Sequence, residues 1–210
     1  MKPIELKEHA KPEEAEALMQ MLEWINPLGK RLQDHITRKC YPLRIRRGEL
    51  LIKPGEISTH TFFICSGVIR GYIKDGGAEI TTWITAENNF ATAIHSFFFQ
   101  VEAIEYLQAL EDCELLAFSF TDLEKTFQKF PSFNIVARKI YQKYYADAEN
   151  RALLARMKNA DLKYQHFLQS HGDLANRIPI KYIASYMGIA SETLSRLRSK
   201  KASATRRRKK

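Results

Sequence analysis

The residues best suited to chemistry lie near the carboxyl end of the chain, between Ile180 and Arg198. Ala184 and Gly188 are four residues apart, which fits two closely crossing helices joined by a tight turn with positive φ at the glycine. The second helix would then expose Glu192, Thr193, Ser195 and Arg196. Arginine can donate to guanine, glutamate can accept from cytosine N4, and hydroxyls can bond to either. The spacing is typical of a helix-turn-helix, which reads bases in the major groove of DNA.

Further side chains around these two helices could contact bases or phosphates. The full set of predicted DNA contacts is Lys181, Tyr182, Ser191, Glu192, Thr193, Ser195, Arg196, Arg198 and Lys200. Ser191 could also cap the second helix by accepting a backbone N–H. An ordinary helical hairpin of the same composition is the alternative interpretation, and the basic residues that follow favour DNA binding.

The positive charge of the chain is concentrated at its carboxyl end. The net charge is +9, from 33 basic and 24 acidic residues. Nine basic residues and no acidic residue lie in the last fifteen positions, so the rest of the chain carries no net charge. Such a cluster is typical of contact with a phosphate backbone, although a solvated tail that aids solubility would look the same. After Lys200 there is no apolar alternation, so we expect a disordered basic tail in place of a two-stranded wing.

The remaining reactive side chains are too scattered to form a catalytic or metal site. Cys40, Cys65 and Cys113 are widely separated and odd in number, which excludes a disulfide framework and a four-thiolate metal site within one chain. No His-x-His pair occurs. Three isolated histidines are His35, His60 and His95. We therefore expect no metal, no cofactor and no catalytic residues.

The elements that must position these residues follow from periodicity. Residues 12–38 have apolar side chains at helical spacing. From Tyr41 to about Phe120, short apolar runs alternate with glycine-containing turns, and roughly eight short strands suggest a small barrel or jelly roll. From Thr121 the pattern is helical again, with one long helix to about Asn159. No apolar run is long enough for a membrane span and no signal peptide is apparent, so we expect a cytoplasmic protein.

The long helix carries a narrow stripe of apolar and small residues. Its members are Ala137, Ile140, Tyr144, Ala148 and Ala155. Two such stripes facing each other would form a coiled-coil-like seam between two copies of the chain. The alternative is a stripe that packs against its own barrel, and both could hold because other apolar side chains share the helix.

With these features together, the chain resembles the cyclic-AMP receptor protein and fumarate–nitrate regulator (CRP/FNR) family of bacterial transcription factors. The resemblance runs from Leu43 to Lys200. It rests on the segments 47–56, 62–70, 109–114 and 183–196. It implies that Glu192 and Arg196 correspond to the acid and the arginine that relatives use to read bases. Ser191 stands where the family has a further arginine, so the target sequence is expected to differ.

The resemblance also predicts where an effector would bind. Family members that bind cyclic nucleotides hold the phosphate with an Arg-Ser or Arg-Thr pair and the ribose with a Glu after Gly; these positions fall on Ala103-Ile104 and Thr92-Ala93. The intervening residues 91–100 contain three phenylalanines and no lysine or arginine. The predicted pocket is therefore apolar or empty, and no cyclic-AMP binding is expected. Its candidate residues, which could equally be core, are Trp83, Phe90, Thr92, Ala93, Ala103, Ile104 and Tyr106.

These observations predict an α+β protein with three parts. Residues 1–120 hold N-terminal helices and a jelly-roll sensor domain, residues 121–159 hold connecting and dimerisation helices, and residues 160–210 hold the helix-turn-helix with its basic tail. The predicted function is a homodimeric, sequence-specific DNA-binding transcription regulator that recognises a palindromic site. Its effector is unknown, and RNA polymerase is a candidate partner. The alternatives are a cupin-like metal-dependent enzyme and a protein-interaction scaffold that binds no ligand.

Overall fold

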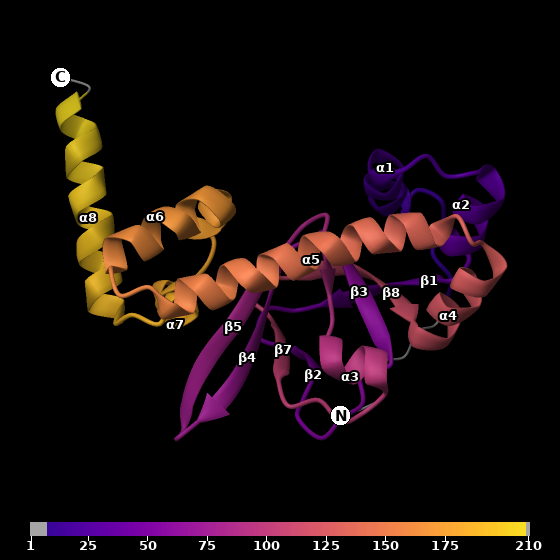
Figure 1. Cartoon of the computed structure of the whole chain (residues 1–210), viewed down its shortest axis with the longest axis horizontal. Helices are drawn as coiled ribbons and strands as arrows, with labels where there is room; N and C mark the ends of the chain where they lie inside the picture. Colours follow the sequence, from indigo (N-terminus) through magenta and orange to yellow (C-terminus); the bar gives the residue numbers. More distant parts are fainter. Residues whose placement is uncertain (1–7, 209–210) are drawn as a thin grey trace. The chain divides into compact units, whose positions relative to one another are not determined.

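The chain divides into two compact units (Figure 1). The computed structural model describes residues 8–208, with side chains through Lys201. The N-terminal unit combines Met1–Ile73 with Ile84–Tyr144, and the C-terminal unit combines Lys74–Trp83 with Tyr145–Lys210. A short segment from the middle of the barrel sequence thus groups with the C-terminal helices.

The N-terminal unit is built from two antiparallel sheets and flanking helices. Its helices are α1 (Glu16–Ile25), α2 (Lys30–Thr37), α3 (Ile94–Phe99), α4 (Phe120–Lys129) and the first half of α5 (Phe133–Arg156). The strands of the chain are β1 (Cys40–Ile45), β2 (Leu50–Ile52), β3 (His60–Ser66), β4 (Val68–Asp75), β5 (Ala78–Ala86), β6 (Phe90–Ala91), β7 (Tyr106–Ala109) and β8 (Cys113–Ser119). Strand order is β1-β8-β3-β6 in one sheet and β2-β7-β4-β5 in the other. The predicted α+β jelly roll is confirmed.

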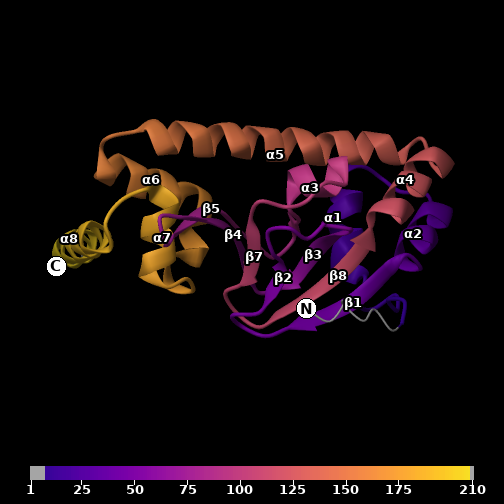
Figure 2. The same cartoon turned by 90° about the horizontal axis from the view of Figure 1, so that it is seen from below.

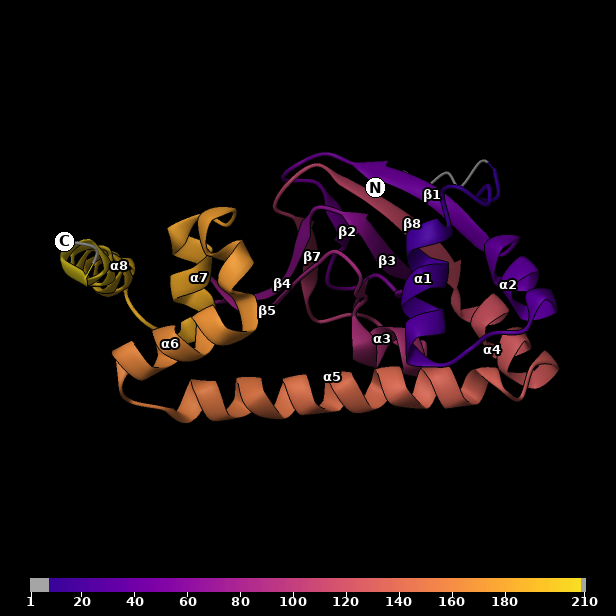
Figure 3. The same ribbon diagram turned by 90° about the horizontal axis from the view of Figure 1, so that it is seen from above.

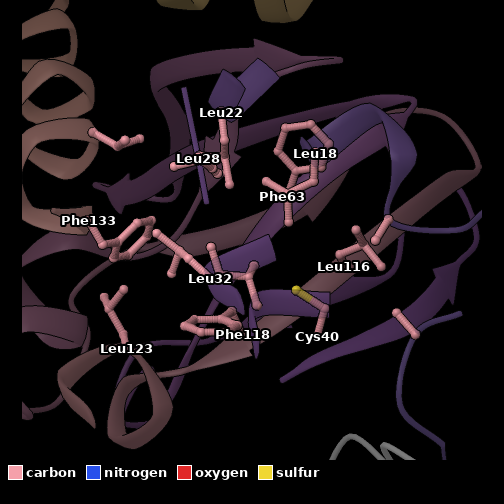
Figure 4. Close-up of a cluster of buried hydrophobic side chains, with 14 of the residues drawn as sticks. Leu18, Leu22, Leu28, Leu32, Cys40, Phe63, Leu116, Phe118, Leu123 and Phe133 are labelled. Carbon is pink, nitrogen blue, oxygen red and sulfur yellow. The ribbon is translucent and has the colours of Figure 1, made fainter. Parts of the chain in front are cut away.

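Helices cover the outer face of the β1-β8-β3-β6 sheet (Figure 4). Phe63, Leu116 and Phe118 pack there against side chains of α1, α2 and α4, including Leu22 and Leu32. Because successive strand residues point to opposite faces, the neighbouring side chains of these strands face the second sheet and form the interior of the barrel. The sheet is therefore buried on both faces, which explains the continuous apolar runs in its strands.

Two features of the barrel follow directly from the residue types. Gly67 joins β3 to β4 with φ +102°, and a Cβ there would lie 2.5 Å from Cys113 Sγ. Only glycine fits this turn. All three cysteines are free, with Cys40 and Cys113 buried and Cys65 half-buried. Burial raises the pKa of Cys65 and of Cys113 to about 11.

Helix α3 lies beside the first half of α5 (Figures 2 and 3). The rings of Phe98 and Tyr141 meet edge to face, with centroids 5.4 Å apart. Phe97 is buried behind them, against Phe120. The phenylalanine-rich run predicted around an effector pocket therefore anchors α3 to the helices of its own unit.

The C-terminal unit is helical, except for the strand ends that it receives from β4 and β5. It contains the second half of α5, α6 (Ala160–His171), a short 3-10 turn (Gly172–Asn176), α7 (Ile180–Met187) and α8 (Ser191–Arg208). Among the described residues, no helix combines the length and apolar character needed to cross a membrane.

Candidate nucleic-acid interface and effector region

Helices α6, α7 and α8 pack around a small apolar core. Phe167 from α6, Ile183 and Met187 from α7, and Leu194 from α8 are all almost completely buried. Ala184 is 1% exposed, so the small side chain predicted at this helix crossing does lie in the contact. The core fixes α7 and α8 as a pair, which is the arrangement predicted from the sequence.

The turn between α7 and α8 closes as the sequence predicts. Gly188 has φ +62° and ψ +44°, the left-handed conformation that costs glycine little. The Ile189 N–H donates to the Ala184 carbonyl at 3.0 Å and the Gly188 N–H to the Ser185 carbonyl at 3.0 Å. These bonds satisfy carbonyls that the end of a helix would otherwise leave unpaired. The chain can therefore reverse into α8 within three residues.

A buried lysine completes this helix end. Lys163 on α6 is 5% exposed, and its Nζ donates to the Met187 carbonyl at 2.7 Å. A cation at the C-terminus of a helix is also favoured by the helix dipole. Asn159 holds the start of α6 in place by accepting from the N–H groups of Asp161 and Leu162. Lys163 thus links α6 to the turn between α7 and α8. Sequence reasoning missed this role because a single lysine in a helix is normally expected on the surface.

One face of α8 consists of exposed polar side chains. Its members are Glu192, Ser195, Arg196, Ser199 and Lys200. They recur at three- and four-residue steps, so they lie along one side of the helix. The opposite side carries Leu194, which is fully buried, and Leu197, which is half-buried. The structure therefore brings Glu192, Ser195, Arg196 and Lys200 of the predicted contacts onto one continuous surface.

Other residues predicted to contact DNA are placed differently. The Arg198 Nη2 donates to Asn176 Oδ1 at 2.9 Å, so this arginine ties α8 to the turn that precedes α7. Thr193 and Tyr182 are half-buried. Ser191 is the first residue of α8. The carbonyl of Ala190, directly before it, accepts a hydrogen bond from the Leu194 N–H. Lys181 is exposed on α7, with its Nζ 4.7 Å from the ring centroid of Tyr182.

The basic end of the chain differs from the prediction. Helix α8 continues to Arg208, so the expected disorder after Lys200 is wrong for the described part of the segment, and residues 209–210 lie outside it. The physical reason is that alanine, arginine and lysine are good helix formers, and no glycine or proline ends the helix. Within the described residues no strand follows α8.

In the effector region, neutral side chains hold α3 in place. Ser58 is fully buried; its N–H donates to Ser96 Oγ at 2.8 Å, and its hydroxyl lies 3.1 Å from Thr92 Oγ1. The Gln100 Nε2 donates to the Phe97 carbonyl at 2.6 Å. Burial lowers the pKa of the nearby His60, so its ring is neutral at neutral pH. These polar groups hydrogen-bond within the segment and its surroundings, and they bring no positive charge to it.

The positions aligned with the phosphate-binding pair are occupied by apolar side chains. Ala103 is buried, with its N–H donating to the Glu56 carbonyl and its carbonyl accepting from the Gly55 N–H. Ile104, in contrast, is 80% exposed. Ala93 is buried directly before α3. Neither of the aligned side chains can donate a hydrogen bond to an anion.

The aromatic residues predicted to line a pocket are dispersed. Phe90 meets Phe63 edge to face and belongs to the helix-covered core, because β6 presents it to the outer face. Tyr106 stacks on Tyr72, with ring centroids 4.7 Å apart. Trp83 belongs to the segment that groups with the C-terminal unit. The predicted set therefore does not form one site within the N-terminal unit.

A buried cation does occur in the barrel, at Arg70 on β4. It is 1% exposed, and its Nε and Nη2 donate to Gln108 Oε1 at 3.0 and 2.7 Å. Its guanidinium carbon lies 4.0 Å from the ring centroid of Tyr72. The Arg70 guanidinium thus contacts Gln108 and Tyr72 within the barrel. Among the described residues, no group of three or more histidine, cysteine or acidic side chains could hold a metal ion.

The stripe predicted for a dimer seam is divided. Ala137 is buried, Ile140 packs against the helix-covered core, and the Tyr144 hydroxyl accepts from the Phe90 N–H at 2.6 Å. These three residues pack inside their own unit, which is the alternative that the sequence left open. Ala148 and Ala155 are exposed. The alternative of packing against the barrel holds for the first half of the helix.

The comparisons with known proteins agree with this architecture. Residues 42–130 match the family model of the cyclic nucleotide-binding domain. No curated protein sequence matches the chain. Among solved structures, FixK2 from Bradyrhizobium japonicum is 19% identical, with 79% of this chain and 86% of that chain covered and a TM-score of 0.68.

Two further solved structures show the same fold. The c-di-GMP responsive global regulator CLP from Xanthomonas campestris is 14% identical, with 84% and 93% covered and a TM-score of 0.65. A protein from Eubacterium rectale described as a transcriptional regulator of the CRP/FNR family is 17% identical, with 85% of each chain covered and a TM-score of 0.65. At these identities the likeness establishes the fold.

Replacing Lys163 with methionine should loosen the helix pair. The change keeps the length of the side chain but leaves the Met187 carbonyl without its charged donor, at an expected cost of about 1.5–3 kcal/mol. Hydrogen exchange of the α7 and α8 amides measures the loss. Lys200→Met, on the exposed face of α8, is the control and should leave exchange unchanged. Equal exchange in the two variants would contradict the role of Lys163.

Proposed function

Because residues 42–130 form a domain of the cyclic nucleotide-binding type within a chain that has the CRP/FNR regulator fold, we propose that this protein is a homodimeric transcription regulator that binds specific DNA sequences. The observation that carries the proposal is the exposed face of α8, which follows a tight turn and a packed first helix. A face of this kind is required of a helix that enters the major groove.

In this proposal the two helices have different roles in DNA binding. At 1.5 Å per residue, the 18 residues of α8 span about 27 Å, enough to cross the groove and reach phosphates beyond it. Helix α7 would cross the phosphate backbone, with Lys181 exposed near its N-terminus. The basic sequence at the end of α8 adds affinity that does not depend on base sequence.

Base reading falls to the first two turns of α8. Arg196 can donate to guanine O6 and N7, and Glu192 can accept from cytosine N4 one helical turn away. Ser195, between them, can bond to either kind of base edge. Arg198 is not among the base readers, because its guanidinium bonds to Asn176.

In this proposal the dimer seam keeps Ala148 and Ala155 of the predicted stripe and replaces its other members by exposed residues of α5. The exposed apolar and small residues of this helix are spaced alternately by four and three positions. They are Tyr141, Tyr145, Ala148, Ala152 and Ala155. This is the spacing of a coiled-coil seam, and Tyr145 is 77% exposed. A two-fold arrangement would place two α8 helices on half-sites about one turn of DNA apart, which implies a palindromic site.

The effector domain does not bind cyclic AMP in this proposal. Support comes from Ala103 and Ile104 at the positions where relatives hold the phosphate, and from the neutral side chains around α3. An anionic phosphate requires charged or well-placed donors, which these positions lack. A regulator whose barrel responds to another ligand remains the proposed function. Nothing in the arrangement favours a metal-dependent enzyme.

Arg196→Ala should weaken binding to the specific duplex by about 1–3 kcal/mol and affect a scrambled duplex little, because the lost contact is to a base. Fluorescence anisotropy at fixed salt measures both. Arg198→Ala is the control and should not change the ratio between the two duplexes. An equal loss on both duplexes after the Arg196 change would mean that this side chain contacts only phosphate.

Tyr145→Glu should produce monomers and weaken DNA binding, because it places a charge on the exposed seam of α5. Light scattering gives the mass, and thermal unfolding should change little. Ile140→Glu, in the packed half of the helix, should instead lower the melting temperature. A Tyr145→Glu protein that is still dimeric would refute this seam.

Cyclic AMP at millimolar concentration should produce no binding heat in titration calorimetry, because Ala103 and Ile104 offer its phosphate no side-chain donor. The variant Ile104→Ser serves as a comparison, since it restores only one of the family's donors and should also remain silent. Stoichiometric binding to the wild-type protein would overturn this part of the proposal.

A further inference from the structure

Ser185 on α7 makes two hydrogen bonds to the backbone of β5. Its hydroxyl oxygen accepts from the Thr81 N–H at 2.9 Å and donates to the Glu79 carbonyl at 3.1 Å. Residues two apart in a strand direct these groups to the same edge. A single side chain of the helix pair thus takes the place that a neighbouring strand would occupy.

The position of β5 explains why this edge is available. It is the last strand in the order β2-β7-β4-β5, so one of its edges has no strand beside it. Unpaired strand edges are usually covered or shortened in folded proteins. Thr81 is only 3% exposed, and α7 lies beside this strand (Figures 2 and 3). The helix that packs against α8 therefore covers the edge of the part of β5 that belongs to its own unit.

The contact falls on the part of α7 that is proposed to meet DNA. Ser185 and Lys181 are four residues apart and share one face of the helix. The hairpin segment 74–83 carries the exposed acids Asp75 and Glu79 against one base, Lys74. Carboxylates of a hairpin that is bound to α7 would be repelled by the phosphates that Lys181 attracts.

We propose that the tip of the β4–β5 hairpin, Lys74–Trp83, is an autoinhibitory latch on the DNA-binding helices. While Ser185 holds β5, the hairpin occupies the face of α7 that must seat on the phosphate backbone, and release of the hairpin is needed for full DNA affinity. The tip continues without a break into β4 and β5 of the N-terminal unit. A change in those strands can therefore reach α7 through the backbone itself. This inference rests on the proposed DNA-binding function.

The variant Ser185→Ala removes both hydrogen bonds and keeps a good helix former on α7. The Thr81 amide should then exchange faster with solvent, and affinity for the specific duplex should rise about three- to tenfold, as expected for the loss of one to two hydrogen bonds from the latched state. Ser170→Ala is the matched control. Its hydroxyl bonds only within α6, to the His166 carbonyl at 2.8 Å, so neither readout should change.

Each readout can overturn the proposal on its own. Unchanged Thr81 exchange in Ser185→Ala would mean that the contact does not hold the strand. Faster exchange with unchanged or lower DNA affinity would mean that the hairpin supports α7 and does not inhibit it. If neither protein bound duplex DNA, the proposed function and the latch would both fail, while the exchange data would still report on the contact.

Discussion

The end of α7 is the constraint on which the candidate DNA interface depends. Four carbonyls at a helix C-terminus have no partner within the helix, and here the helix ends inside a packed unit. Gly188 provides the left-handed turn, two backbone N–H groups return to the last turn, and the Lys163 ammonium reaches the Met187 carbonyl. With these groups satisfied, the direction in which α8 leaves is fixed. The exposed face of α8 then follows from helical periodicity alone.

In the barrel, too, polar groups around a helix find hydrogen-bond partners within the protein. Ser58, Thr92, Ser96 and Gln100 are hydrogen-bonded to one another around α3. Phe97 and Phe98 then attach the segment to the helices behind it. The segment is therefore ordered by contacts within its own unit.

Much of the fold could be predicted because its signals are local. Gly188, Ala184 and the polar positions of α8 define the helix pair through steric requirements that any such pair shares. The stripe on α5 could not be assigned, since an apolar repeat has the same spacing whether it faces its own barrel or a second copy. The directions of Ile104 and Phe90 could not be predicted, because they depend on strand pairing between distant segments. Lys163 and Ser185 gave no signal, because their roles exist only across tertiary contacts.

The three free thiols of the N-terminal unit have low reactivity because they are buried or half-buried. Oxidants attack the thiolate form of cysteine, and the fraction of thiolate depends on the pKa. With the pKa of Cys65 and of Cys113 near 11, roughly one thiol in ten thousand is ionised at neutral pH. Burial raises the pKa of Cys40, which lies in the helix-covered core, still further. Burial thus keeps these thiols protonated at neutral pH and lowers their reactivity toward peroxide and in disulfide exchange.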